Sequence, residues 1–215
     1  MAVSPDRKFL YAASRAKPYT VFAYAIHPVT GSRTQLSSSP AAESFPYISL
    51  DRTGRFLLGA SYGGNLVSVN AIGSDGRVAA EPLQVIPVGR NAHSIRVDES
   101  NRFAFAPSLG SDRIFMFSFD AKSGQLRSNT PSTYLMKTGT GPRHFVTSGD
   151  NRFLYVLTEM AGTVTTFALD GNSGPLKQVS VASGLPPDTN LTQGEVRLPP
   201  APNMRPRNRE KDIWA

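Results

Sequence analysis

Two side chains that can carry positive charge, Arg143 and His144, follow a proline in the stretch GTGPRHFVTSGDNRFLY, residues 139–155. A second histidine, His93, precedes a similar apolar run, and a carboxylate, Glu159, stands where a later run ends. Together such groups suit a hydrolytic reaction, because hydrolysis needs a base to activate water and a cation or donor for the developing oxyanion. Whether they meet depends on the elements that carry them.

The chain repeats itself with a period of 45 to 50 residues. Four polar turns each lead into an apolar run, and the residues that open these runs are Phe9, Phe56, Phe103 and Phe153. Four segments that alternate apolar and polar residues follow, and the glycines that close them are Gly31, Gly76, Gly124 and Gly174. Alternation ending in a glycine turn is typical of half-buried strands and hairpins. Units of this length without a helical period indicate the blades of a β-propeller.

We therefore predict an all-β fold, a β-propeller of about four blades, each a four-stranded antiparallel sheet, in one partial domain over residues 1–215. The predicted segments are blades at about 1–44, 45–91, 92–141 and 142–183, a Pro-rich loop at 184–211, and the start of a further blade at 212–215. A solenoid is the competing architecture, but no stacked repeat of 20 to 30 residues is visible. Because the first and last units stop within an inner strand, we expect a larger ring that is incomplete here at both ends.

Positions counted from the repeat phenylalanines show which candidate residues occupy equivalent places in different blades. His93 and Arg143 both lie ten residues before a repeat phenylalanine, and Glu159 lies six residues after one, as do Arg15 and Tyr62. In a propeller, the start of the inner strand and the end of the second strand lie on the same face, so these side chains should surround one mouth of the channel. We predict His93, Arg143 and Glu159 as catalytic residues, with Arg143 as the oxyanion or anion partner and Glu159 or His93 as the acid/base.

Arg15, Tyr62 and His144 are predicted to bind substrate. His144 is expected to point to the opposite side of its strand from Arg143 and to orient it. Each assignment has a purely structural alternative: a hydrogen-bonded His93, an interblade salt bridge of Arg143, a solvated turn carboxylate at Glu159, and rim positions for Arg15 and Tyr62.

Composition narrows the classes of function. Net charge is +7, yet the basic residues are scattered except near the C-terminus, where prolines break them up, so we expect no nucleic-acid partner. No apolar stretch is long enough to span a membrane. There are no cysteines and only three histidines, without metal-ligand spacing, so we expect neither a disulfide nor a metal site.

Four segments carry a family resemblance: SPDRKFLYAAS, AHSIRVDESNRF, GTGPRHFVTSGDNRFLYVLTEM and DIWA. They resemble the lactonase β-propeller family, which is seven-bladed and includes bacterial propeller-type 6-phosphogluconolactonases and fungal carboxymuconate-lactonizing enzymes. The resemblance supports the roles given to His93, Arg143 and Glu159.

The resemblance implies hydrolysis of a small anionic substrate, 6-phosphogluconolactone, to 6-phosphogluconate in the pentose phosphate pathway, in the cytoplasm and without a cofactor. Two alternatives stay open: lactonization of a carboxymuconate, and a non-catalytic propeller that binds a partner.

Overall fold

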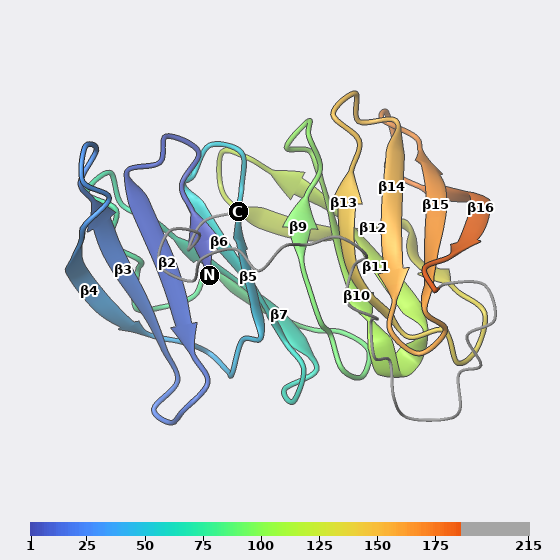
Figure 1. Ribbon diagram of the computed structural model, residues 1–215, viewed down its shortest axis with the longest axis horizontal. Coiled ribbons are helices and arrows are strands. Elements are labelled where there is room, and N and C mark those ends of the chain that lie inside the picture. The colour runs from blue at the N-terminus through green and yellow to red at the C-terminus, as the bar shows by residue number, and fades with distance from the viewer. Residues whose placement is uncertain (186–215) are drawn as a thin grey trace, which may run out of the picture. The chain divides into compact units, whose positions relative to one another are not determined.

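The computed structural model describes residues 1–185, of which Met1–Gly184 form one compact unit. This unit contains four antiparallel sheets of four strands each, so the all-β fold class expected from the repeats is confirmed (Figure 1). The predicted loop at 184–211 lies, from residue 186 on, outside the described residues, as does the predicted strand start at 212–215.

Each sheet is built from four strands that are consecutive in the chain, β1–β4, β5–β8, β9–β12 and β13–β16. Their bounds are β1 Ala2–Val3, β2 Phe9–Ser14, β3 Thr20–Ile26, β4 Arg33–Pro40, β5 Tyr47–Leu50, β6 Phe56–Ser61, β7 Leu66–Ala71, β8 Gln84–Pro87, β9 Arg96–Val97, β10 Phe103–Ser108, β11 Arg113–Asp120, β12 Gln125–Leu135, β13 Pro142–Thr147, β14 Phe153–Thr158, β15 Thr163–Leu169 and β16 Leu176–Ser183. One short 3₁₀ helix, η1 (Leu109–Ser111), lies between β10 and β11.

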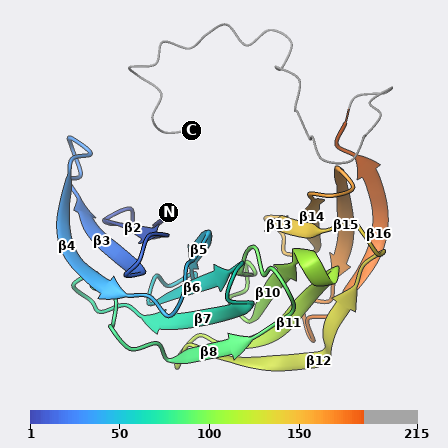
Figure 2. The ribbon, with the colours of Figure 1, turned by 90° about the horizontal axis from the view of Figure 1, so that it is seen from below.

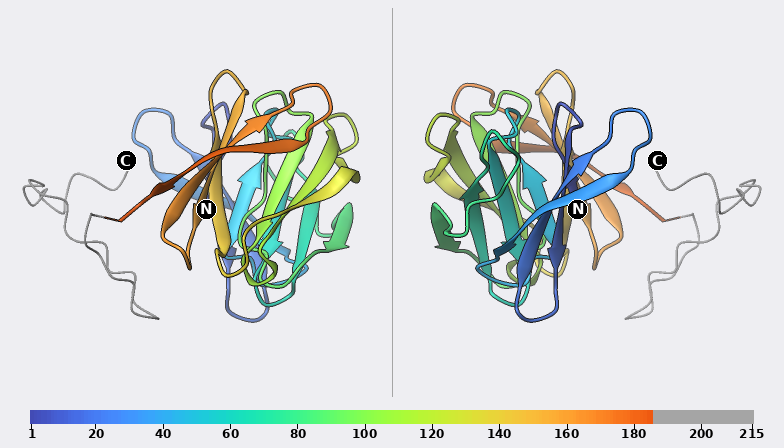
Figure 3. Two further views of the ribbon diagram at one scale, coloured as in Figure 1. Left: turned by 90° about the vertical axis from the view of Figure 1, so that its right-hand side faces the viewer. Right: turned by 90° about the vertical axis from the view of Figure 1, so that its left-hand side faces the viewer.

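Within this unit the sheets lie side by side in chain order along an arc (Figure 2). The first strands of the sheets, β1, β5, β9 and β13, line the inside of the arc, and the fourth strands lie on its outside. Neighbouring sheets touch through their first and second strands, β1 with β5, β5 with β9, and β10 with β13. Figure 3 shows the two end sheets, the fourth in front on the left and the first in front on the right.

Burial of the second strands reflects their place in the arc. All six residues of β6 and of β10 are buried, because each of these strands has a neighbouring sheet on both faces. In β14, buried Leu154, Val156 and Thr158 alternate with more exposed residues, because the described residues cover one face of this sheet. Three apolar clusters fill the spaces between successive sheets.

The two sequence landmarks of the repeat meet at each boundary between sheets. The phenylalanine that opens the second strand of one sheet packs against the glycine turn of the next, in the pairs Phe9–Gly76, Phe56–Gly124 and Phe103–Gly174. The arginine before the phenylalanine donates to the same turn: Arg55 to the carbonyl of Ala121, and Arg102 to that of Gly171. The common period therefore has a direct structural cause.

A second contact joins the turns that follow the inner strands. The Asp98 carboxylate accepts from the backbone of Arg102 and Phe103 at 3.0 Å and from Asn151 Nδ2 of the next sheet at 2.7 Å. In return, Asn151 Oδ1 accepts from the backbone of Glu99 at 3.0 Å. Asp51 and Asn101 repeat this arrangement one sheet earlier, with Asn101 donating at 3.0 Å. Both asparagines have positive φ, a conformation that asparagine tolerates better than most residues.

Candidate active site

The site lies where the inner strand of a sheet begins and the second strand ends. The backbone of Glu159 donates to the carbonyl of Gly141 at 2.8 Å, and that of Leu109 donates to the carbonyl of Asn91 at 3.0 Å. In both sheets, therefore, the residue six positions after the repeat phenylalanine lies beside the start of the inner strand.

Arg143 holds the centre of this site. Its Nε donates to Nε2 of His93 at 3.1 Å and lies 2.9 Å from Oε2 of Glu159. The strand register explains its position: Pro142 pairs with Thr158 and His144 with Leu157, so Arg143 is an extra residue in a β-bulge. Bulges re-aim side chains and are common next to active sites. The Arg143 carbonyl also accepts from Ser94 Oγ at 2.7 Å, which ties the bulge to the preceding sheet.

His93 is a neutral imidazole of one tautomer. Because Nε2 accepts a hydrogen bond from Arg143, the ring proton must lie on Nδ1. Burial, followed by the nearby charges of Arg143, His144 and Arg15, lowers the pKa of His93 to about 4. Its Nδ1 is buried and has no hydrogen-bond partner among the described residues. Unsatisfied buried donors of this kind are rare in proteins and are often associated with catalytic or ligand-binding positions.

A row of aromatic rings links the second, third and fourth sheets at the site and ends again on the second. Tyr62 lies 5.8 Å from His93, His93 lies 4.9 Å from His144, and His144 lies 5.2 Å from Tyr47, each measured between ring centroids. Burial and the Arg143 charge lower the pKa of His144, while Glu159 opposes this shift. Both histidines of the row are therefore mainly neutral near pH 7.

The structure thus brings together five of the six residues predicted from the sequence. Arg143 contacts both His93 and Glu159, and Tyr62 and His144 pack on His93, whereas Arg15 acts at the site through a small effect of its charge on the pKa of His93. The expectation that His144 points away from Arg143 and orients it is wrong. Both side chains contact His93, because the bulge turns Arg143 to the side of the strand that His144 occupies, and the atoms that hold Arg143 belong to His93 and Glu159. Their catalytic and binding roles stay predictions.

Sequence reasoning missed Tyr47. It occupies the same repeat position as His144, nine residues before a repeat phenylalanine, so counting from the phenylalanines could have found it. In a single sequence, a tyrosine in a strand is most simply interpreted as a core residue. Only the structure shows that the Tyr47 ring packs against His144.

This arrangement supplies a cation, a carboxylate and neutral imidazoles at one position. Within residues 1–185 the Arg143 side chain makes its polar contacts through Nε, so its terminal nitrogens remain able to donate to an anionic oxygen. The same residues contain no cluster of three or more His, Cys, Asp or Glu suited to a metal ion. In this part of the chain, no helix has the length and apolarity needed to traverse a lipid bilayer.

Antiparallel four-stranded sheets that follow one another along an arc, with polar side chains at the starts of the inner strands, define the β-propeller class of proteins. The chain belongs to the lactonase family of seven-bladed β-propellers, because the sequence model of that family matches residues 1–203.

Relatives with curated names agree with this family. The chain is 35% identical over 205 residues to a 6-phosphogluconolactonase of Serratia proteamaculans, a match that covers 95% of this chain and 61% of that protein. It is 36% identical over 186 residues to one of Erwinia tasmaniensis, covering 86% and 54%. The chain therefore spans about 60% or less of the length of these relatives.

A solved structure has the same architecture. The periplasmic gluconolactonase PpgL of Pseudomonas aeruginosa superposes with a TM-score of 0.79 at 27% sequence identity, over 88% of this chain and 58% of that one.

Proposed function

We propose that this protein hydrolyses the lactone of a phosphorylated sugar acid, converting 6-phosphogluconolactone to 6-phosphogluconate. The names of the relatives support the substrate, and the contact of Arg143 with His93 and Glu159 supports the chemistry. A sugar phosphate is charged and is retained inside cells, so the proposal also places the reaction in the cytoplasm.

In the proposed reaction, a water molecule attacks the lactone carbonyl carbon, and the Glu159 carboxylate takes a proton from that water. The carbonyl oxygen becomes an oxyanion, which the terminal N–H groups of Arg143 stabilise. The bond between the carbonyl carbon and the ring oxygen then breaks, and the proton on Glu159 passes to the departing ring oxygen. The product is the open hydroxy acid, which loses its proton to solvent.

His93 acts in this scheme through Arg143. An imidazole with a pKa of about 4 is a weak base, and its accepting nitrogen is already used by Arg143. It therefore positions the guanidinium, and between the two acid/base candidates the geometry favours Glu159. The buried Nδ1–H of His93 remains able to donate to the substrate or to an ordered water.

The test is an assay of the intact protein with 6-phosphogluconolactone, at a pH where spontaneous hydrolysis is slow. We expect a rate clearly above the spontaneous one, and a loss of about 100-fold or more in kcat for Arg143→Met, the usual effect of removing an oxyanion donor. Arg127→Met, which removes a charge from the exposed face of β12, should leave the rate unchanged. A wild-type rate equal to the spontaneous one would refute the proposal.

A further inference from the structure

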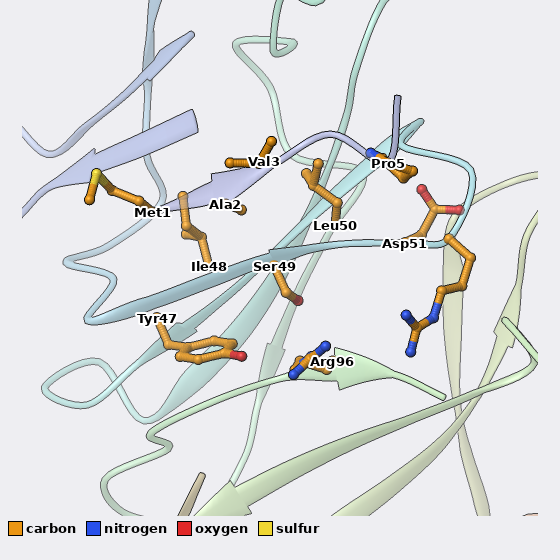
Figure 4. Close-up of a pocket in the computed structure, with 11 residues that line it drawn as sticks. Met1, Ala2, Val3, Pro5, Tyr47, Ile48, Ser49, Leu50, Asp51 and Arg96 are labelled. Carbon is orange, nitrogen blue, oxygen red and sulfur yellow. The ribbon is translucent and has the colours of Figure 1, made fainter. Parts of the chain in front are cut away.

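A cavity of about 360 Å³ lies along the inner strands, next to the ring row of the site (Figure 4). Residues of β1 and β5 form most of its wall, and Arg96 of β9 contributes from the following sheet. Figure 4 shows the hydroxyl end of Tyr47 directed toward Arg96, with Ser49 beside them. Volumes of this size are typical of small-molecule sites.

Arg96 is a half-buried cation that has no counter-ion among the described residues. Within residues 1–185 no carboxylate forms an ion pair with it, whereas Arg52 in the same cavity wall is already paired with Glu99. The Asp51 carboxylate also lines the cavity, but it is 1% exposed and its oxygens accept from its own turn and from Asn101. Because a partly desolvated charge is costly unless it is paired, this guanidinium favours an incoming anion.

Tyr47 joins the cavity to the site described above. Burial raises the pKa of the Tyr47 phenol, and the charge of Arg96 opposes that rise. Because the Tyr47 hydroxyl is directed toward Arg96 (Figure 4), the phenol O–H and the guanidinium can both donate to one ligand. On its other side, the Tyr47 ring packs on His144, which packs on His93. Two ring contacts, of 5.2 and 4.9 Å, therefore separate the Arg96 cavity from the partner of Arg143.

We propose that Arg96 and Tyr47 form a second anion-binding subsite, which holds the phosphate of the substrate while Arg143 holds its lactone carbonyl. This inference rests on the proposed function and adds the residues that select a phosphorylated lactone over an unphosphorylated one. The substrate carries its carbonyl at one end and its phosphate at the other, and the rings of Tyr47, His144 and His93 have Arg96 beside the first and Arg143 beside the last. Arg96 contacts the phosphate both before and during ring opening, so its contribution falls mainly on KM.

The first experiment compares the full-length wild type with Arg96→Met on 6-phosphogluconolactone and on glucono-δ-lactone. We expect kcat/KM for the phosphorylated lactone to fall by about 10- to 100-fold, mostly through KM, with little change for glucono-δ-lactone. Tyr47→Phe, which removes only the hydroxyl, should shift the same ratio by a smaller factor. Arg127→Met is the charge-matched control and should not change it.

Equal losses on the two lactones, or no loss on either, would overturn the subsite while leaving the proposed function standing. If neither lactone is hydrolysed, the proposed function fails, and the subsite is tested instead by direct binding titrations of 6-phosphogluconate and of gluconate. A preference for 6-phosphogluconate that disappears in Arg96→Met would still support the subsite, and equal binding of the two acids by the wild type would reject it. If Arg96→Met fails to fold in a thermal-unfolding control, Tyr47→Phe decides by the same comparisons.

Discussion

Phe56 of the second sheet packs so closely on Gly124 of the third that a β-carbon on this glycine would lie 2.5 Å from the phenylalanine ring. Gly124 also has φ of +76°, a conformation that side-chain-bearing residues rarely adopt. Both constraints act at one position, so the boundary between the sheets depends on the absence of a side chain.

Gly124→Ala should therefore lower the free energy of unfolding by about 2–4 kcal/mol, the combined cost of the left-handed backbone and of overpacking. Gly31→Ala is the matched control, because Gly31 has φ of +69° but a β-carbon added there would meet no atom within 4 Å. It should cost only the backbone part, about 1 kcal/mol. Urea unfolding of both variants measures the difference, and equal losses would mean that the Phe56 contact contributes nothing.

Asp98→Ala should destabilise the protein by about 2–3 kcal/mol, because it leaves buried backbone N–H groups and Asn151 without an acceptor. Asp120→Ala removes similar local bonds, to Lys122 and Ser123, from an exposed turn. It should therefore change stability by no more than about 0.5 kcal/mol. Thermal or urea unfolding distinguishes the two, and a comparable loss in both variants would rule out a special role for the buried link between sheets.

His93 should make stability depend on pH. Its pKa is about 4 in the folded protein and 6.5 when unperturbed, so between these values the unfolded chain binds a proton that the folded protein does not. Stability is therefore lost as pH falls from 6.5 toward 4, and the whole loss amounts to about 3 kcal/mol. Urea midpoints at pH 7 and pH 4.5 should therefore differ more for the wild type than for His93→Gln. The same pH dependence in both proteins would contradict the shifted pKa.

Glu159→Gln should lower kcat for lactone hydrolysis by about 10²- to 10⁴-fold with little effect on KM, because the amide keeps the shape of the carboxylate but cannot take a proton. Steady-state kinetics on the phosphorylated lactone provides the measurement. Retention of near wild-type kcat would assign the base elsewhere, with His144 as the next candidate, since its ring lies against His93 in the same site.

The sheets and the repeat positions of the candidate site residues could be predicted from the sequence, because both follow from local periodicity. Strand alternation and glycine turns located the repeats. Counting from the phenylalanines placed His93 and Arg143 at equivalent positions, and Glu159 at a second position on the same face. Their meeting in the structure follows from the fixed hydrogen bonding between inner and second strands, as in the bond from Glu159 to Gly141.

Contacts that depend on how sheets are angled to one another could not be predicted in this way. The approach of Arg96 to Tyr47 joins residues of different sheets at different repeat positions, and neither residue type stands out in the sequence. The bulge that turns Arg143 toward His93 is likewise a change of register by one residue, to which the periodic pattern is insensitive.

The contacts between successive sheets use different chemistry on their two sides. The earlier sheet contributes a phenylalanine ring, a guanidinium and an aspartate carboxylate, and the later sheet contributes a bare glycine, a backbone carbonyl and an asparagine amide. The interface is therefore heterologous, that is, head-to-tail, and a sheet cannot join a neighbour in the reverse order. Duplication or deletion of one whole repeat would recreate the same junction on either side, so a fold of this kind can change its number of blades without inventing a new interface.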